Sequence, residues 1–215
     1  MTIKFKDNFI ERYSKLTDID VFKEITVKEL RKSIRINTLK TNVNEIISRL
    51  ENKWNLEQVP WCKEGFFISG ERRDIGNLIE HNLGYFYVQE AASMIPPLVL
   101  IPEENDLVLD MASAPGSKTT QMAAMMNNKG LIVANDYDPI RIKSLGINLQ
   151  RCGVSNTIIT IMHGMQFKDY QFDKILLDAP CSGTGAIRKS LDTLRIYNSK
   201  MIGKLASLQK KLIIN

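Results

Sequence analysis

Four apolar segments in the second half of the chain alternate with segments of helical pattern, and this alternation constrains the fold more than any other feature. The apolar segments are DLVLD (106–110), LIVAND (131–136), TIITI (157–161) and DKILLD (173–178). Their β-branched residues and lack of polar alternation are typical of strands buried on both faces. Strands joined through helices in this way form a parallel, doubly wound sheet. The sequence therefore predicts an α/β fold.

The segments between these strands carry helix start and stop signals. The helix KTTQMAAMM (118–126) is followed by Asn127, Asn128 and Gly130, which favour its termination. Asp138 and Pro139 suit the N-cap and first turn of the next helix, which is expected to end at Gly153. Ligands of such sheets bind at the carboxyl ends of the strands. The notable residues expected at that edge are Asp110, the loop 112–118, Asp136, His163, Asp178 and Cys181.

The first 95 residues predict a separate, small α+β domain. SIRINTL (33–39) and GFFIS (65–69) are expected to be strands, and Asn42 can cap a helix over VNEIISRLENK (43–53). GYFYVQEAASMIPPLVL (84–100) is expected to be a strand that enters a helix, with the helix stopping near Pro96-Pro97. We therefore divide the chain into residues 1–95 and 96–215.

Composition and charge limit the function classes. The 215 residues have a net charge of +5, with three cysteines, no CxxC spacing and two histidines, which argues against a zinc site and a disulfide framework. No apolar run approaches a membrane span, and the N-terminus lacks a signal-peptide pattern, so a cytoplasmic protein without a membrane or metal partner is expected. Residues 182–215 carry seven basic side chains against one acid, which indicates either a solvated helix face or a phosphate-binding stripe.

The loop DMASAPGSKTT (110–120) allows a ligand to approach the backbone closely, because its residues are small and a helix begins after it. A P-loop requires lysine directly after glycine, whereas Ser117 intervenes here, and a GxGxxG fingerprint is absent. S-adenosylmethionine remains, with its carboxylate on the loop and its ribose diol on Asp136. The alternatives are that Asp136 is a turn residue and that Lys118 is a solvated residue of the helix start.

The motifs DMASAPGSKT, NDYDPIR, FDKILLDAPCSGTGAIRK and GYFYVQEAASMIPPL resemble the RNA cytosine-5 methyltransferases related to Nop2, Sun and RsmB, and the archaeal tRNA branch in particular. The resemblance covers residues 30 to 212. It implies a class I methyltransferase sheet of Rossmann-like type and an N-terminal RNA-recognition-like subdomain. It also implies S-adenosylmethionine as the methyl donor and RNA, in particular tRNA, as the substrate. The cofactor-binding positions that it implies are Ala112, Ser113, Ala114, Pro115, Gly116, Ser117, Lys118, Asp136, His163 and Asp178.

Cys181 in the motif DAPC favours methylation of carbon over methylation of nitrogen. A thiolate that adds to carbon 6 of cytosine makes carbon 5 nucleophilic, and an acid such as Asp178 near N3 stabilises the charge that develops. The resemblance assigns the attack to a different cysteine, in a later Thr-Cys-Ser motif, and assigns Cys181 to product release. Attack by Cys181 itself and a plain buried cysteine are the alternatives. Cys62 and Cys152 are expected to be structural.

Two departures from the family pattern change the expectation for this chain. No Thr-Cys-Ser or Thr-Cys-Thr occurs, and only four of about seven expected strands are found, so the sheet is expected to be incomplete and the chain to lack a C-terminal segment. The fourth strand would then keep an unpaired edge. His163 stands where the family has an acid, and a neutral imidazole can still donate one hydrogen bond. The alternative function is therefore an inactive remnant that binds RNA or cofactor without turnover.

Overall fold

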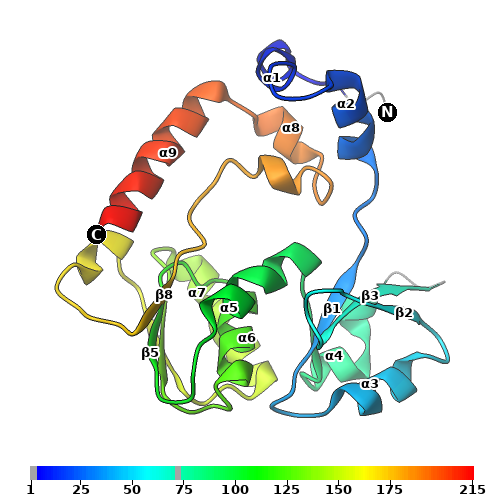
Figure 1. Cartoon of the computed structure of the whole chain (residues 1–215), viewed down its shortest axis with the longest axis vertical. Coiled ribbons are helices and arrows are strands. Elements are labelled where there is room, and N and C mark those ends of the chain that lie inside the picture. Colours follow the sequence, from blue (N-terminus) through cyan, green and yellow to red (C-terminus); the bar gives the residue numbers. More distant parts are fainter. Residues whose placement is uncertain (1–3, 71–73) are drawn as a thin grey trace. The chain divides into compact units, whose positions relative to one another are not determined.

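The computed structural model describes residues 4–70 and 74–215, which fall into two compact units. One unit, called here the two-sheet unit, is Arg31–Asp178, and it contains both β-sheets (Figure 1). The other, called the helical unit, joins the described part of residues 1–30 to Ala179–Asn215. The boundary expected at residue 95 therefore lies inside the two-sheet unit, and as a domain boundary it stays a prediction.

The first sheet of the two-sheet unit is antiparallel, in the order β2-β3-β1-β4. Its strands are β1 (Ser33–Ile36), β2 (Asn55–Gln58), β3 (Gly65–Ser69) and β4 (Phe86–Val88). The helix α3 (Val43–Leu50) begins as predicted, because the Asn42 side chain accepts a hydrogen bond from the Glu45 N–H. Ile46 and Leu50 of α3 pack on the sheet in a core with Ile34, Ile36, Trp54, Phe66, Ile68, Ile75 and Phe86. Short helices η1 (Ile75–Asn77) and α4 (Ile79–Asn82) precede β4.

The predicted end of a helix at Pro96-Pro97 is wrong, because α5 (Ile95–Leu100) begins there. A proline lacks an N–H group, but the N–H groups of a first helical turn have no intrahelical partner, so proline is tolerated at that position. The short helix η2 (Ala91–Met94) leads from β4 into α5. The chain leaves α5 through Ile101, which has a left-handed backbone conformation.

The second sheet is parallel, as predicted, in the order β7-β6-β5-β8. Its strands are β5 (Leu107–Asp110), β6 (Leu131–Asn135), β7 (Thr157–Thr160) and β8 (Lys174–Leu176). Helix α6 (Ser117–Met125) connects β5 to β6 and α7 (Pro139–Cys152) connects β6 to β7, while η3 (Gly164–Phe167) lies before β8. Asp138 caps α7 and Gly153 ends it, both as predicted. The central strands β5 and β6 are largely buried, with Val108, Leu109, Ile132 and Ala134 inaccessible.

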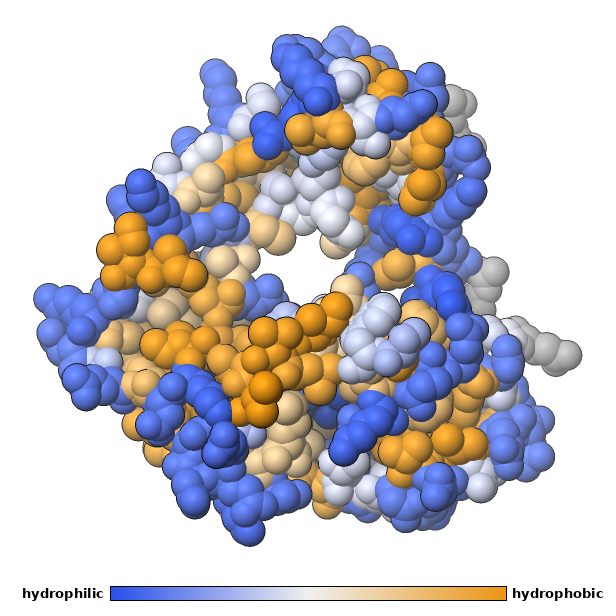
Figure 2. All heavy atoms as spheres, viewed as in Figure 1, coloured by the Kyte–Doolittle hydropathy of each residue, from blue (hydrophilic) through white to orange (hydrophobic). Residues whose placement is uncertain are grey.

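The strand β8 lies at an edge of this sheet and pairs with β5 within the described residues. It is shorter than predicted, because residues 177 and 178 follow it in irregular structure. Exposed apolar side chains gather on β8 and on α5, where Ile175, Ile95, Val99 and Ile101 reach solvent (Figure 2).

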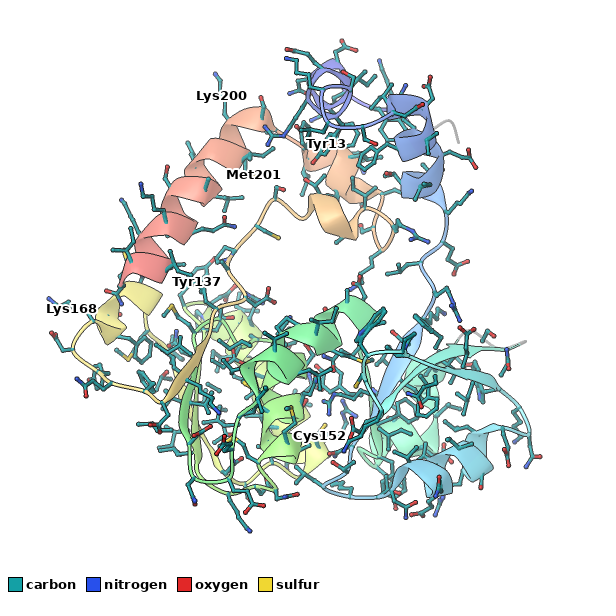
Figure 3. The ribbon with its side chains drawn as sticks, in the orientation of Figure 1. Tyr13, Tyr137, Cys152, Lys168, Lys200 and Met201 are labelled. Atoms are coloured by element: carbon teal, nitrogen blue, oxygen red, sulfur yellow. The ribbon has the colours of Figure 1, made fainter. Side chains whose placement is uncertain are left out.

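Polar side chains join the two sheets into one unit. The Asn37 Nδ2 group donates to the Gly84 carbonyl and to the Cys152 carbonyl, both at 2.8 Å. The Lys40 ammonium donates to the Leu83 and Arg151 carbonyls. The first sheet is thereby fastened to the end of α7, whose last residue is Cys152 (Figure 3).

The helical unit contains α1 (Asp7–Tyr13), α2 (Ile19–Val27), η4 (Thr184–Ala186), α8 (Asp192–Ile196) and α9 (Ser199–Ile214). Aromatic rings hold the two ends of the chain together, because Phe9 contacts both Phe22 and Tyr197. Phe9 is fully buried in this core, with Ile187 and Leu194. The lysines of α9 are exposed.

Candidate functional site

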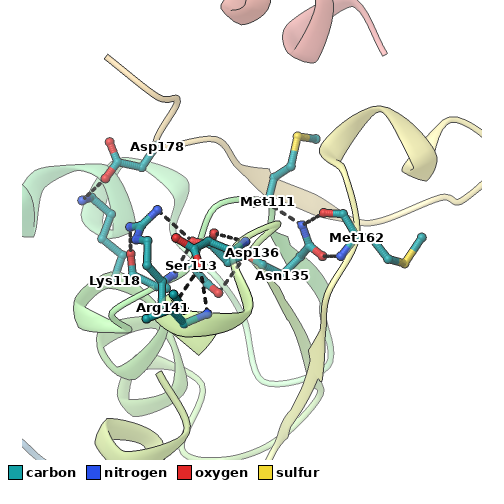
Figure 4. Close-up of polar contacts among 11 residues, drawn as sticks. Met111, Ser113, Lys118, Asn135, Asp136, Arg141, Met162 and Asp178 are labelled. Carbon is teal, nitrogen blue, oxygen red and sulfur yellow. Dashed lines mark hydrogen bonds and ion pairs between the residues drawn. The ribbon is translucent and has the colours of Figure 1, made fainter. Parts of the chain in front are cut away.

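The loop that follows β5 is fastened to the end of β6. The Ser113 N–H and hydroxyl both donate to the Asn135 carbonyl, at 2.7 and 2.9 Å, and the Ala114 N–H donates to Oδ2 of Asp136 at 3.2 Å (Figure 4). The Gly116 N–H closes a turn on the Ser113 carbonyl at 2.7 Å. The loop residues predicted to bind a cofactor therefore lie beside Asp136, at the start of α6.

Gly116 is the N-cap of α6 and has a φ of +104°. Side chains rarely adopt this conformation, and a Cβ atom there would lie 2.9 Å from the Leu145 Cδ1 atom of α7. Glycine at this position therefore lets the loop turn into α6 while α7 packs closely against it.

Gly116→Ala is expected to lower the free energy of unfolding by about 1–3 kcal/mol, because the backbone is strained and Leu145 must move. Urea unfolding followed by circular dichroism measures this loss. Gly76→Ala is the matched control, because nothing lies within 4 Å of a Cβ atom at Gly76 and its φ is not positive, so a change within about 0.5 kcal/mol is expected. Equal effects of the two substitutions would contradict the prediction.

Asn135, the last residue of β6, holds the loops after β5 and β7 on either side of it. Its Nδ2 group donates to the Met111 and Met162 carbonyls, at 3.0 and 2.9 Å. Its Oδ1 atom accepts from the Thr160 hydroxyl and from the Met162 N–H, both at 2.9 Å. Asn135 is 1% exposed, and these four bonds use all the donors and acceptors of its amide (Figure 4). No role was predicted for Asn135, although a polar side chain within an apolar strand is a usable signal.

Asp136 follows β6 and is 1% exposed. Besides the Ala114 N–H, its Oδ2 atom pairs with the Arg141 guanidinium of α7 at 3.1 Å, and Oδ1 accepts from the Asp138 N–H at 3.1 Å. A carboxylate oxygen has about two acceptor positions, so Oδ1 keeps one that no described residue fills. Asp136 therefore makes the contacts of a turn residue, as in the alternative interpretation, and its Oδ1 atom keeps one unfilled acceptor position.

Lys118 pairs with Asp178 through a 2.7 Å contact between Nζ and Oδ2 (Figure 4). A lysine in the first turn of a helix is unfavourable with the helix dipole, and this ion pair explains its presence. The Lys118 side chain is 12% exposed and that of Asp178 59%, so the lysine is not a solvated residue of the helix start. The pair brings α6 and the segment after β8 together at the same edge of the sheet.

Asp110, the last residue of β5, is a buried acid beside this pair. Its Oδ2 atom accepts a 2.7 Å hydrogen bond from the Thr119 hydroxyl, and its Oδ1 atom has no partner among the described residues. Burial raises the pKa of Asp110 to about 7, against the lowering effects of the Thr119 hydrogen bond and of Lys118. Asp110 was expected at this edge, but no role was predicted for it.

Two predicted site residues stand apart from this arrangement. His163 is exposed and caps η3. Its Nδ1 atom accepts from the backbone N–H of Met165, and its backbone N–H donates to the Gln166 side chain. This contact fits the alternative of a loop histidine. Cys181 is exposed and belongs to the helical unit, three residues after Asp178 in the chain. Cys62 and Cys152 are buried, as expected for structural cysteines.

The fold and the site define a class I methyltransferase: a parallel sheet, a small-residue loop leading into α6, and an acid after the second strand. No helix in residues 4–70 and 74–215 has the length and apolar character that a bilayer span requires. The same residues hold no cluster of three or more histidine, cysteine or acidic side chains suited to a metal ion.

Comparisons with known proteins identify the family of this chain within the class I methyltransferases. Residues 97–215 match the family described as 16S rRNA methyltransferase RsmB/F, and residues 5–91 match the N-terminal domain of 16S rRNA methyltransferase RsmF. The chain therefore belongs to the RsmB/F family of RNA cytosine-5 methyltransferases, of the Nop2/Sun type, as the motifs predicted.

Three relatives illustrate the similarity. The tRNA (cytosine(49)-C(5))-methyltransferase of Pyrococcus abyssi is 48% identical over 214 residues, which are 98% of this chain and 69% of that protein. Ribosomal RNA small subunit methyltransferase F of Vibrio atlanticus is 49% identical over 194 residues, 86% of this chain and 41% of that enzyme. The structure of a methyltransferase homolog protein from Pyrococcus horikoshii is 34% identical with a TM-score of 0.78, over 97% of this chain and 72% of that one.

Proposed function

We propose that this chain binds S-adenosylmethionine at the carboxyl edge of the parallel sheet and serves the methylation of carbon 5 of cytosine in RNA, with tRNA as the substrate. The observation that carries the proposal is the loop 111–116, bound to Asp136 at one side and leading into the first turn of α6 at the other. The family is one of RNA cytosine-5 methyltransferases. The similarity to the Pyrococcus abyssi tRNA enzyme, 48% identity over 98% of this chain, supports tRNA, and the 49% identity to the Vibrio rRNA enzyme over 86% of this chain makes rRNA the second candidate.

The residues of this edge fit such a cofactor. The first-turn N–H groups of α6 have no intrahelical partner and favour an anion, which is the role proposed for the loop toward the cofactor carboxylate. The free acceptor position of Asp136 suits a ribose hydroxyl. The cofactor supplies the methyl group. Lys118 holds Asp178 at the rim of the site, where Asp178 is proposed to stabilise charge on the target base.

Cys181 is proposed to act after methyl transfer. The hydrogen on carbon 5 must leave as a proton, so that its electron pair re-forms the double bond between carbons 5 and 6 and the attacking thiolate departs. Cys181 is proposed to assist this release, with its sulfur as the acceptor of the carbon 5 proton. Because the attacking cysteine of the family stands in a Thr-Cys-Ser motif and the 215 residues contain none, we propose that these residues alone bind cofactor and RNA without turnover.

Methyl transfer and binding test this function separately. Titration calorimetry with S-adenosylhomocysteine and filter binding with tRNA and 16S rRNA transcripts should both give saturable binding, stronger for tRNA. Tritium transfer from labelled S-adenosylmethionine should be at background for these residues alone. Absence of S-adenosylhomocysteine binding by folded protein would overturn the cofactor assignment, and measurable tritium transfer would overturn the proposed need for a second cysteine.

Asp136→Ala is expected to weaken S-adenosylhomocysteine binding about ten- to a hundredfold, because one charged hydrogen bond to the ribose and the support of the loop are lost. The measurement is calorimetry at a temperature where both proteins are folded by circular dichroism. Asp169→Ala, which removes an exposed carboxylate, is the control and should leave the affinity unchanged. Unaltered affinity in the Asp136 variant would remove this residue from the site.

A further inference from the structure

Arg35 is a buried cation within a strand of the first sheet. It lies in the middle of β1 and is 2% exposed. Its Nε atom donates to Oε1 of Gln89 at 2.8 Å, and its Nη2 atom donates to the Thr120 hydroxyl at 2.9 Å and to the Ser117 carbonyl at 3.4 Å. All three acceptors are neutral, and the guanidinium forms no ion pair with a carboxylate of the described residues.

The buried charge of Arg35 is unfavourable for the stability of the protein without a ligand. Burial lowers the pKa of Arg35, but an arginine guanidinium stays protonated in proteins. A buried cation is costly when no anion accompanies it. Its contacts on Ser117 and Thr120 place it beside the first turn of α6, where the helix dipole already adds positive potential. The folded protein therefore holds a buried positive charge beside the first turn of α6, with neutral groups as its direct partners.

The guanidinium is also held in one orientation. Gln89 of the segment after β4 accepts from Arg35 and donates to Oε1 of Gln121 and to the Ser93 carbonyl, both at 3.0 Å. Gln121 of α6 donates in turn to the Met94 carbonyl at 2.9 Å. Gln121 is buried, so solvent does not screen this network strongly. The first sheet thus delivers a fixed positive charge to α6.

We propose that Arg35 is a positioning residue for the carboxylate of the amino-acid end of the cofactor. Its charge acts through α6, because its Nε atom donates to Gln89 and its Nη2 atom donates to Ser117 and Thr120 of that helix. Lys118 is already paired with Asp178, whereas Arg35 has only neutral acceptors, so its charge can favour an anion at this turn. The inference rests on the proposed function, since it requires that the cofactor bind at the loop.

Two ligands distinguish this role from a structural one. S-adenosylhomocysteine carries the amino-acid carboxylate, and 5′-methylthioadenosine lacks the amino-acid end while it keeps the ribose and adenine. Calorimetry with Arg35→Met should show S-adenosylhomocysteine bound about tenfold more weakly and 5′-methylthioadenosine bound within about twofold of the wild type. Arg35→Lys keeps the charge and should retain most of the S-adenosylhomocysteine affinity.

The controls separate the failure of this inference from the failure of the proposed function. Arg49→Met, which removes an exposed arginine of α3, should change neither affinity. If Arg35→Met does not fold, Arg35→Gln replaces it, because glutamine is neutral and keeps an amide donor. Equal weakening of both ligands, or of neither, would overturn the inference while wild-type binding still supports the cofactor. If the folded wild type binds neither ligand, the proposed cofactor is wrong and the inference falls with it.

Discussion

Asp110→Asn is expected to stabilise the protein at pH 8 by about 2–4 kcal/mol and to have little effect at pH 4. Asparagine keeps an oxygen for the Thr119 hydroxyl and carries no charge, so it resembles the protonated form of the buried acid. The sheet then no longer contains an ionised carboxylate with an unpartnered oxygen.

The direction follows from the raised pKa. Between the ordinary value of 3.8 and the folded value of about 7, the folded protein keeps a proton on Asp110 that the unfolded chain has released. Wild-type stability therefore falls as pH rises through this window, by at most about 1.4 kcal/mol per pH unit, and this contribution levels off above pH 7. Asp110→Asn removes this contribution.

Urea unfolding at pH 4, 5, 6, 7 and 8 measures the difference between wild type and Asp110→Asn. Asp106→Asn is an informative control just before β5, because Asp106 accepts from the Glu103 N–H and pairs with Lys174 at 2.9 Å. These contacts lower the pKa of Asp106, so its substitution should destabilise the protein above pH 4, the opposite sign. A constant difference between wild type and Asp110→Asn at all five pH values would contradict the assignment.

Asn135→Ala is expected to lower the free energy of unfolding by about 2–5 kcal/mol, since four hydrogen bonds are lost at a buried position. The buried Met111 carbonyl and the half-buried Met162 carbonyl would lose this donor. The loops on either side of β6 would also lose their common attachment, so S-adenosylhomocysteine affinity should fall together with stability.

Chemical denaturation and calorimetry on the same samples test the two effects of Asn135→Ala. Asn44→Ala removes an exposed asparagine of α3 and should change stability by no more than about 0.5 kcal/mol. Asn135→Asp is a stricter comparison, because aspartate has the same shape but cannot donate to the two carbonyls. Wild-type stability in both Asn135 variants would mean that the four bonds contribute nothing net.

Local sequence signals predicted much of the fold. Asn42, Asp138 and Gly153 fixed helix ends correctly, because caps act through neighbouring backbone groups. The proline pair 96–97 misled, since proline both stops helices and starts them. The strand β2 was not predicted because its residues, apart from Leu56, are polar and exposed, and its pairing with β3 makes it a strand.

Those residues of the candidate site that belong to recognisable motifs could be predicted from the sequence. Their positions after strands predicted that the loop 112–118, Asp136 and Asp178 lie at one edge of the sheet, which the structure confirms, while their binding roles stay a prediction. The buried position of Arg35 could not be predicted. An arginine in a short strand is usually expected to face solvent, and the sequence does not show that all four residues of β1 are buried. The partnership of Lys118 with Asp178 also required the fold, which brings residues 60 positions apart within 2.7 Å.

The contacts that join the two sheets have a consequence for recombination among relatives. Asn37 and Lys40 donate to the carbonyls of Cys152 and Arg151, and Arg151 donates to the His81 carbonyl. The partners of these residues are therefore encoded 70 to 115 positions downstream. A chimera that exchanges residues 1–95 alone would place a foreign surface against the end of α7. Transfer of residues 31–95 together with α7 would keep donors and acceptors matched. The two segments that must be exchanged together, residues 31–95 and α7, are therefore not contiguous in the gene.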